Sequence, residues 1–168
     1  MKKIVLFIVV SFGCCMQIFS QTTNNTEFSF LQNSKIPSFS ITTADSNSFS
    51  NNDLPKGKSV AIIYFRPDCY YCKAKAKFLS ERMDSVQNAF FVWVSDYPVA
   101  QLHPFIDEFG LGRFSNVCVG QDSHAFLSTY FKATSTPYVA VYNNKGVFSK
   151  EFRNGTMVHN IIMAVNEH

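Results

Sequence analysis

Cysteine is scarce in this chain, and its charges are nearly balanced. The 168 residues include five cysteines, and 15 Lys and Arg stand against 12 Asp and Glu, a formal charge of +3. So few cysteines exclude a disulfide-rich scaffold. So small a charge excludes the strongly basic surface that is typical of proteins bound to nucleic acid or to anionic membranes. We therefore expect no nucleic-acid partner.

The chain also lacks an apolar run of the roughly 20 residues that a membrane-spanning helix needs. At the N-terminus, Lys2 and Lys3 precede a short apolar stretch, Ile4–Val10, and small or polar residues follow it. This order is typical of a secretory signal peptide. We predict a signal peptide over residues 1–20, with cleavage after Ser20, and export to the periplasm or cell envelope.

Cleavage there would leave three cysteines, Cys69, Cys72 and Cys118. One close pair and one odd thiol predict a redox pair rather than a structural disulfide framework. Cys118 lies in a short apolar run and is interpreted as a small buried residue, with a third redox cysteine as the alternative. An alternative to cleavage is lipid attachment at Cys14, although Phe12 matches that processing signal poorly.

Beyond the N-terminus, apolar patterns of strand and helix type alternate. Nearly continuous apolar runs and one hairpin turn predict buried strands at 60–65, 90–94, 117–119, 138–142 and 147–152. Helical spacing predicts helices at 72–86, 102–109, 126–131 and 157–165. Gly110 is expected to end the second helix and Thr156 to cap the last, while Pro104 either starts or kinks the second.

These elements predict an α/β fold with one mixed central sheet and helices on both faces. The alternating segment 36–41 predicts an edge strand or hairpin arm at the N-terminal side of that sheet. Residues 21–35 are rich in Asn, Thr and Ser and are interpreted as a flexible linker. We therefore expect a single domain over residues 36–168, without internal repeats.

The strongest chemical motif is Cys69-Tyr70-Tyr71-Cys72, which follows the first central strand and opens a helical pattern. Two thiols at this spacing can close a reversible disulfide. The N–H groups and partial positive charge of a helix N-terminus would stabilise a thiolate at Cys69 and lower its pKa. Cys72, one turn further on, would lie deeper. Tyr70 and Tyr71 either contact substrate or only fill the turn.

A second motif, Thr136-Pro137, stands directly before the predicted strand 138–142. A proline that opens a central strand cannot donate to the sheet, so its presence needs a reason. One interpretation is a cis-proline that faces the cysteine turn and exposes the Thr136 backbone to an extended substrate. The other is an ordinary trans proline at the start of a strand.

Taken in order, these motifs resemble the thioredoxin superfamily, and more closely its exported TlpA/ResA-like branch. The resemblance runs from Ile36 to the C-terminus and includes Ile36-Pro-Ser-Phe39, Asp53-Leu-Pro-Lys-Gly-Lys58 and Ser135-Thr-Pro-Tyr-Val139. It implies the thioredoxin fold, with an N-terminal hairpin extension. It also implies a thiol:disulfide oxidoreductase that acts on protein disulfides, with the reductase direction favoured.

Carried over residue by residue, the resemblance makes Cys69 the attacking and Cys72 the resolving cysteine. Pro137 becomes the cis-proline, and Thr136, Tyr70 and Tyr71 are expected to contact the substrate. The resemblance implies no cofactor and no metal. It further implies disulfide-bearing protein clients, a membrane protein as electron donor, and a monomer.

Three positions depart from thioredoxin. Tyr71 replaces the usual proline before the second cysteine, Asp68 replaces tryptophan before the first, and Ile63 replaces a buried aspartate. Proton transfer must therefore differ, through water or Asp68. Asp68 would oppose a low pKa at Cys69, whereas Arg66 and Lys73 would favour one.

Other functions of this type of chain require different residues at the same positions. A peroxiredoxin-like peroxidase would need Pro and Thr where this chain has Ile62 and Arg66, and c-type haem would need His at Lys73. A copper chaperone could use both thiolates, with His124 as the third ligand. An interaction module with an incidental disulfide is the remaining alternative.

Overall fold

The computed structural model describes residues 31–153 and 155–167. The predicted signal peptide and most of the predicted linker lie outside the described residues. Packing begins before residue 36, because Leu31 is fully buried and Lys35 bridges to Val147. Among the described residues, no helix is long and apolar enough to cross a membrane.

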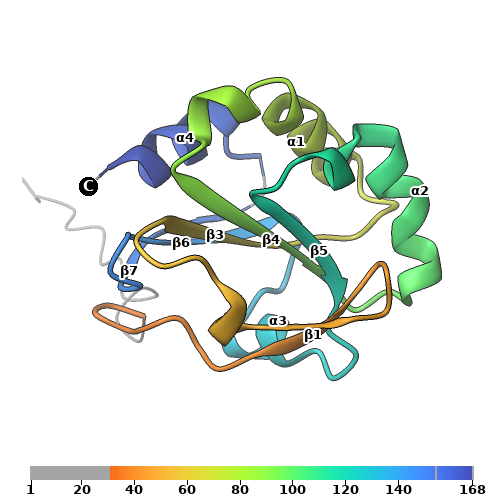
Figure 1. Ribbon diagram of the computed structural model, residues 1–168, viewed down its shortest axis with the longest axis horizontal. Coiled ribbons are helices and arrows are strands. Elements are labelled where there is room, and N and C mark those ends of the chain that lie inside the picture. Colours follow the sequence, from red (N-terminus) through yellow and green to blue (C-terminus); the bar gives the residue numbers. More distant parts are fainter. Residues whose placement is uncertain (1–30, 154, 168) are drawn as a thin grey trace, which may run out of the picture.

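A seven-stranded mixed sheet forms the centre of the domain (Figure 1). In spatial order the strands are β2 (Ser48–Ser50), β1 (Ser40–Thr43), β5 (Val117–Gln121), β4 (Ala89–Ser95), β3 (Ser59–Tyr64), β6 (Tyr138–Tyr142) and β7 (Phe148–Arg153). The central strands β3, β4 and β5 are parallel to one another, whereas β6 and β7 continue the sheet antiparallel beyond β3. At the opposite edge β1 pairs antiparallel with β5 and forms a hairpin with β2.

Helices cover both faces of this sheet. One core lies between the sheet and the helices α1 (Tyr70–Ser80), α2 (Val99–Phe109) and α4 (Val158–Asn166). The other core lies beneath α3 (Phe126–Tyr130) and the first described residues. In Figure 1 the helices α1, α2 and α4 lie above the sheet, and α3 lies below it. The predicted mixed sheet and its two helical layers are confirmed. The N-terminal hairpin is also present, but its first strand spans Ser40–Thr43 instead of the predicted residues 36–41.

The fully buried central strands explain why the sequence shows apolar runs instead of alternation. Every residue of β3, β4 and β6 is buried, because side chains of both orientations meet a hydrophobic layer. Aromatic rings fill the upper core, where Phe65 lies 5.4 Å from Trp93 and 4.5 Å from Phe105, measured between ring centroids. Phe65 follows β3 directly and so anchors the start of the loop that carries the cysteines.

The structure corrects three helix boundaries. The helix after the cysteines ends at Ser80, and Met83–Val86 forms a separate short 3-10 helix that still places Met83 and Val86 in the core. The second helix begins at Val99, so Pro104 lies inside it, and Gly110 ends it with φ of 59°. Thr156 does not cap α4: Met157 is the N-cap residue and makes no capping side-chain bond.

Two further 3-10 helices, Asn51–Asp53 and Leu111–Arg113, complete the connections. The first is closed by a reciprocal capping arrangement in which Ser50 and Asp53 exchange hydrogen bonds.

Candidate active site

Cys69 stands at the N-terminus of α1, just beyond the end of β3. It is the N-cap residue of the helix, and its sulfur accepts a hydrogen bond from the Cys72 backbone N–H at 3.3 Å. Cys69 is partly exposed, whereas Cys72 has no exposed surface, and both are free thiols. The pair thus consists of one accessible sulfur held by helix N–H groups and one enclosed sulfur.

The two thiols have opposite pKa shifts. Burial acts to raise the pKa of Cys69, but hydrogen bonds from Cys72, its backbone N–H included, outweigh it, and the net shift is downward. Burial raises the pKa of Cys72 to about 12, and the neighbouring Cys69 adds to that rise. Near neutral pH the thiolate therefore forms preferentially at Cys69, which is the outer sulfur.

Charged residues near the pair are already matched to partners. Arg66 Nε lies 3.4 Å from Asp68 Oδ1 and 3.1 Å from Tyr97 Oη, and the Tyr97 hydroxyl donates to Asp68 at 3.2 Å. Lys73 Nζ lies 3.0 Å from Glu108 Oε2 on α2. Asp68 and Arg66 thus neutralise each other, and Lys73 is neutralised by Glu108. The hydrogen bonds at the helix N-terminus are what lower the pKa of the Cys69 thiol.

Thr136 and Pro137 lie beside the cysteine turn. Because β6 runs antiparallel to β3, with Tyr138 opposite Tyr64, the residues before β6 meet the residues after β3. The Thr136–Pro137 peptide bond is cis. Cys69 Sγ lies 3.6 Å from the Thr136 carbonyl oxygen, to which the thiol donates. The sequence motifs that lie 67 residues apart therefore meet at one site.

Behind Pro137 lies a buried polar group that sequence reasoning missed. The Tyr138 hydroxyl donates to Glu151 Oε2, and Arg153 Nε lies 2.8 Å from Glu151 Oε1. Arg153 also stacks over the Tyr138 ring, 5.1 Å from its centroid. Alternation along β7 places Glu151 inward, but a lone glutamate in a polar hairpin strand gave no signal of burial.

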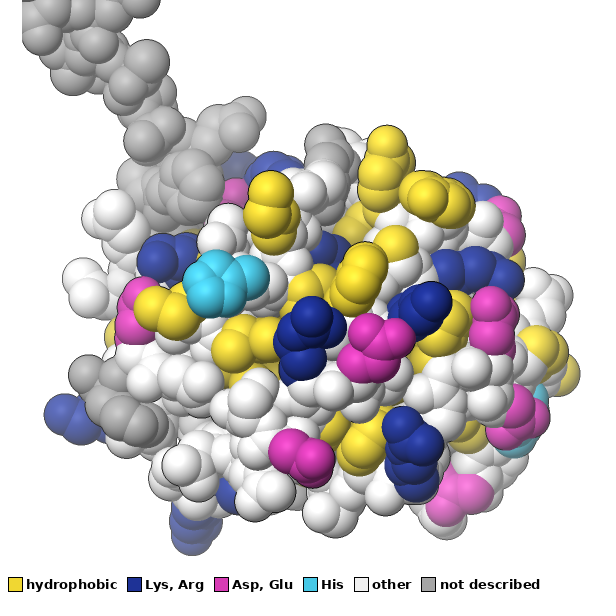
Figure 2. Space-filling view, turned by 90° about the horizontal axis from the view of Figure 1, so that it is seen from above, with side chains coloured by type: hydrophobic (Ala, Val, Ile, Leu, Met, Phe, Trp, Pro, Cys, Tyr) yellow, Lys and Arg dark blue, Asp and Glu magenta, His cyan; other side chains and the backbone are white. Residues whose placement is uncertain are grey.

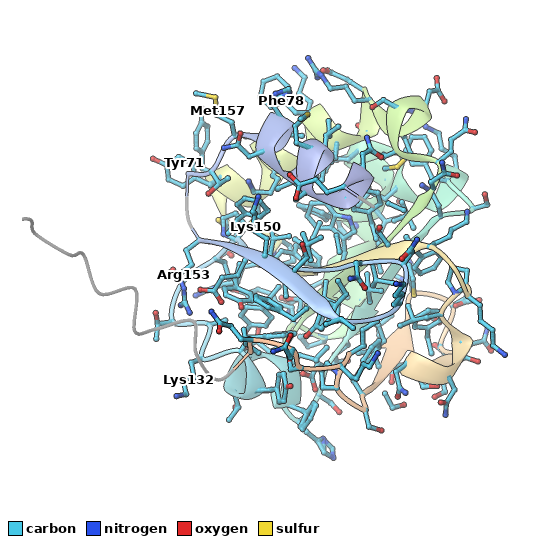
Figure 3. All side chains as sticks on the ribbon, turned by 90° about the vertical axis from the view of Figure 1, so that its left-hand side faces the viewer. Tyr71, Phe78, Lys132, Lys150, Arg153 and Met157 are labelled. Carbon is cyan, nitrogen blue, oxygen red and sulfur yellow. The ribbon has the colours of Figure 1, made fainter. Side chains whose placement is uncertain are left out.

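An apolar cavity of about 380 Å³ opens next to the cysteine turn. Its walls come from α1 and from the start of α4, and they include Tyr71, Phe78 and Met157, which are 59%, 47% and 75% exposed. Figure 3 shows these three side chains at the surface of the same corner. Tyr70, 77% exposed, stacks edge-on against Tyr71. On the face that carries α1, α2 and α4, apolar side chains alternate with charged ones (Figure 2).

Lys75 is the second residue that the sequence did not single out. It lies one turn after Cys72 on α1, is only 4% exposed, and donates from Nζ to the Thr156 carbonyl at 2.7 Å. Its position, three residues after a buried cysteine and four before Leu79, belongs to the apolar face of the helix. A lysine on the apolar face of a helix is unusual, and this position could have identified Lys75 from the sequence.

Cys118 lies away from this site. Its strand, β5, is separated from β3 by β4, and its side chain packs with the core beneath α3, while Cys69 and Cys72 belong to the core above the sheet. Burial raises the pKa of Cys118 to about 12, helped by Asp45 and Asp53. A role as a third redox cysteine at this site is therefore not supported by its position.

The residues of the competing functions are not assembled here. Ile62 is fully buried in β3, and Arg66 is engaged with Asp68 and Tyr97, so neither position offers the groups of a peroxidatic site. Within residues 31–153 and 155–167, no three His, Cys, Asp or Glu side chains are grouped to hold a metal ion. His124 instead pairs with Ser123 at 3.1 Å, and it is not brought to the cysteine pair as a third ligand.

Comparison with known proteins gives matches at the level of structure. No protein-family model and no curated protein sequence matches the chain. A secreted disulfide oxidoreductase of Mycobacterium tuberculosis, described as homologous to E. coli DsbE, has a TM-score of 0.64 and 20% identity, over 76% of this chain and 93% of that one. The thioredoxin domain of a thiol-disulfide oxidoreductase from Bacteroides vulgatus has a TM-score of 0.64 and 19% identity, over 80% and 98%.

A yeast mitochondrial 1-Cys peroxiredoxin also matches, with a TM-score of 0.65 and 12% identity over 78% of this chain and 72% of that one. The fold is thus shared by proteins of different chemistry. The residues at the site, rather than the fold, must distinguish between those chemistries.

The pKa shifts predict an order of reactivity among Cys69, Cys72 and Cys118, the cysteines within the described residues. In the reduced protein we expect iodoacetamide to modify Cys69 first, because its pKa is lowered from that of an ordinary thiol. Cys72 and Cys118 should react slowly until the pH approaches 12, because their thiols stay protonated. Peptide-resolved mass spectrometry after brief alkylation measures this order. Labelling of Cys118 before Cys69 would contradict the site assignment.

Proposed function

The chain has the thioredoxin fold, and on that premise we propose that it is a thiol:disulfide oxidoreductase whose working groups are Cys69 and Cys72. The observation that carries the proposal is the asymmetry of the pair. The partly exposed Cys69 sulfur accepts the Cys72 N–H at 3.3 Å and lies 3.6 Å from the Thr136 carbonyl, while Cys72 is fully enclosed. An accessible nucleophile beside a protected second thiol is the arrangement that disulfide exchange requires.

In the proposed reaction the Cys69 thiolate attacks one sulfur of a client disulfide. A Cys69–client disulfide forms, and the second client sulfur leaves as a thiolate that takes a proton from solvent. The Cys72 thiol then loses its proton and attacks Cys69 Sγ. The client's first sulfur leaves as a thiolate, and the client disulfide has gained two electrons while Cys69 and Cys72 are joined as a disulfide.

Protein clients with disulfides fit the surroundings of Cys69. Tyr70 and Tyr71 expose their rings beside the accessible sulfur, and the apolar cavity continues from Tyr71 to Phe78 and Met157. The carbonyl of Thr136 faces Cys69, so an extended client strand could pair with this backbone while its disulfide reaches the sulfur. We place client contact at Tyr70, Tyr71, Thr136 and Pro137.

We further propose that the protein is exported and acts mainly as a reductase. Export is supported by the N-terminal signal pattern and by the likeness to a secreted oxidoreductase. A reductase in an oxidising compartment needs a source of electrons, and a membrane protein that carries reducing equivalents outward would supply them. The protein itself is proposed to work as a monomer, without cofactor or metal.

Reduction of insulin disulfides in dithiothreitol tests the proposal. We expect the full chain to accelerate the reaction, which is followed by turbidity, and Cys69→Ala to abolish the acceleration because no nucleophile remains. Cys118→Ala is the matched control and should keep the wild-type rate, since Cys118 lies in the other core. If Cys69→Ala is as fast as the wild type, the proposed role of the pair is wrong.

The reduction potential of the pair decides the direction. A value near about −270 mV would place the protein with reductants, and one near about −120 mV with oxidants. Equilibration against glutathione or dithiothreitol redox buffers, with the pair read by alkylation, gives this value.

A further inference from the structure

Lys75 is a buried cation without an acidic partner. Its side chain lies on the buried face of α1 and donates to a neutral acceptor, the Thr156 carbonyl, at 2.7 Å. Across residues 31–153 and 155–167, the ion pairs within 4.0 Å do not include Lys75. Lysine is almost never fully buried unless an opposite charge compensates it. A negative charge close to Lys75 would therefore stabilise its protonated form.

Cys72 is placed to supply that charge. Residues three apart on a helix lie on the same face, with Cβ atoms about 5–6 Å apart, so Cys72 and Lys75 share the buried face of α1. Burial lowers the pKa of the Lys75 amine, and the charge of a Cys72 thiolate acts in the opposite direction and raises it. A protonated Lys75 would in turn favour the Cys72 thiolate, because opposite charges attract.

Among the described residues that line the cavity beside Lys75, none is acidic. Its other ionisable residues are Arg82, which follows α1, His159 on α4, and Tyr71. Arg82 pairs with Glu81 at 3.6 Å. Nearer the cysteines, Arg66 pairs with Asp68 and Lys73 with Glu108, and both pairs are exposed.

We propose that Lys75 provides the positive charge that stabilises the Cys72 thiolate in the resolving step of disulfide exchange. This inference rests on the proposed function. It assigns Lys75 as a positioning residue for the second step, the attack of Cys72 on the mixed disulfide. In that step the Cys72 proton passes to solvent, the Cys72–Cys69 bond forms, and the Cys69–client bond breaks with both electrons going to the client sulfur. Ile63 stands where thioredoxin has a buried aspartate, so this chain has no carboxylate base at that position. Lys75 would instead assist the Cys72 thiol through its positive charge.

The two steps can be separated with 5,5′-dithiobis(2-nitrobenzoate), a small aromatic disulfide. Attack by Cys69 releases one coloured thiolate, and attack by Cys72 on the resulting mixed disulfide releases the second. The full chain is used with Cys14, Cys15 and Cys118 replaced by alanine, so that both phases arise from the pair. Stopped-flow absorbance then gives the two rates at each pH.

In Lys75→Met we expect the first phase to stay within about twofold and the second to slow about tenfold or more at neutral pH. A tenfold loss corresponds to a rise of about one unit in the pKa of Cys72, so the pH profile of the second phase should move upward by that amount. Lys75→Arg keeps the charge and should keep the second phase within about threefold. Lys77→Met is the matched control, an exposed lysine of the same helix, and should change neither phase.

The inference is overturned if the second phase of Lys75→Met keeps its wild-type rate and pH profile. It is also overturned if both phases slow equally, since that outcome indicates only loss of the Thr156 contact, or if Lys75→Arg behaves like Lys75→Met. Should Lys75→Met fail to fold, Lys75→Gln keeps a donor toward Thr156 and carries the same expectation. The assay needs no protein client, so failure of insulin reduction with an intact Lys75 effect would count against the proposed function alone.

Discussion

Replacement of Cys72 by alanine is expected to trap client proteins on Cys69 as mixed disulfides. The Cys69 sulfur keeps its place at the start of α1, because the hydrogen bond that it accepts comes from the backbone N–H of residue 72 and survives the substitution. The first attack therefore proceeds. Release does not, since the enclosed thiol that would displace the client is absent. We expect mixed disulfides to accumulate in Cys72→Ala, whereas the wild-type protein should show almost none.

Non-reducing electrophoresis after acid quenching measures the trap, and the adducts should disappear on reduction. Cys69→Ala/Cys72→Ala is the control in which nothing should accumulate, and Cys118→Ala should also trap nothing. Accumulation in Cys69→Ala but not in Cys72→Ala would show that the nucleophile and the resolving thiol have been exchanged. The identified clients would at the same time test whether the substrates are exported proteins.

The site could be predicted from sequence where local pattern and chemistry agree. The apolar run 60–65 indicates a buried strand, and the CxxC motif that begins four residues after it opens a helical pattern. The structure places Cys69 at the N-cap position, as this order requires. The contact between Cys69 and Thr136 follows from the antiparallel pairing of β3 and β6, which the sequence did not reveal; the family resemblance alone placed Pro137 beside the cysteine turn.

Residues whose role depends on a distant partner were not predictable in this way. Lys75 and Glu151 are polar side chains on buried faces, and their partners, Thr156, Tyr138 and Arg153, are set by tertiary packing. The effects of Asp68 and Arg66 on Cys69 were left open for the same reason. Sequence reveals the charges, but only the structure shows that Arg66 and Asp68 share Tyr97 and pair with each other.

Helix ends were misjudged where a periodic pattern continued beyond the helix. Met83 and Val86 extend the spacing of α1, yet they belong to a 3-10 helix after a break at Glu81 and Arg82. The apolar spacing correctly indicated that these two side chains are buried. A separate 3-10 turn places them in the same core as a longer helix would have done. Thr156 was expected to cap α4, but its hydroxyl donates to Arg153 and its carbonyl accepts from Lys75.

The buried Tyr138–Glu151–Arg153 group links the residues that follow the Thr136–Pro137 bond to the edge strand β7. Glu151 lies on β7 with a side chain only 1% exposed, and it accepts from both the Tyr138 hydroxyl and Arg153. Tyr138 follows Pro137 directly, so the first residue of β6 is held by a charged partner on the neighbouring strand. Burial, first, and the bond to Glu151, second, raise the pKa of the Tyr138 hydroxyl, which therefore remains a donor throughout the physiological pH range.

Glu151→Ala is expected to lower the free energy of unfolding by about 2–3 kcal/mol, because the buried Tyr138 hydroxyl loses its acceptor and Arg153 loses its ion pair with Glu151. The loss stays below that of a fully enclosed ion pair, since the Arg153 side chain is 30% exposed. Glu167→Ala is the matched control: it breaks an exposed pair, Lys150–Glu167 at 3.7 Å, and should cost about 0.5 kcal/mol or less. Urea unfolding followed by tryptophan fluorescence measures both variants. Equal losses would mean that the buried carboxylate adds nothing to the stability of the domain beyond a surface charge pair.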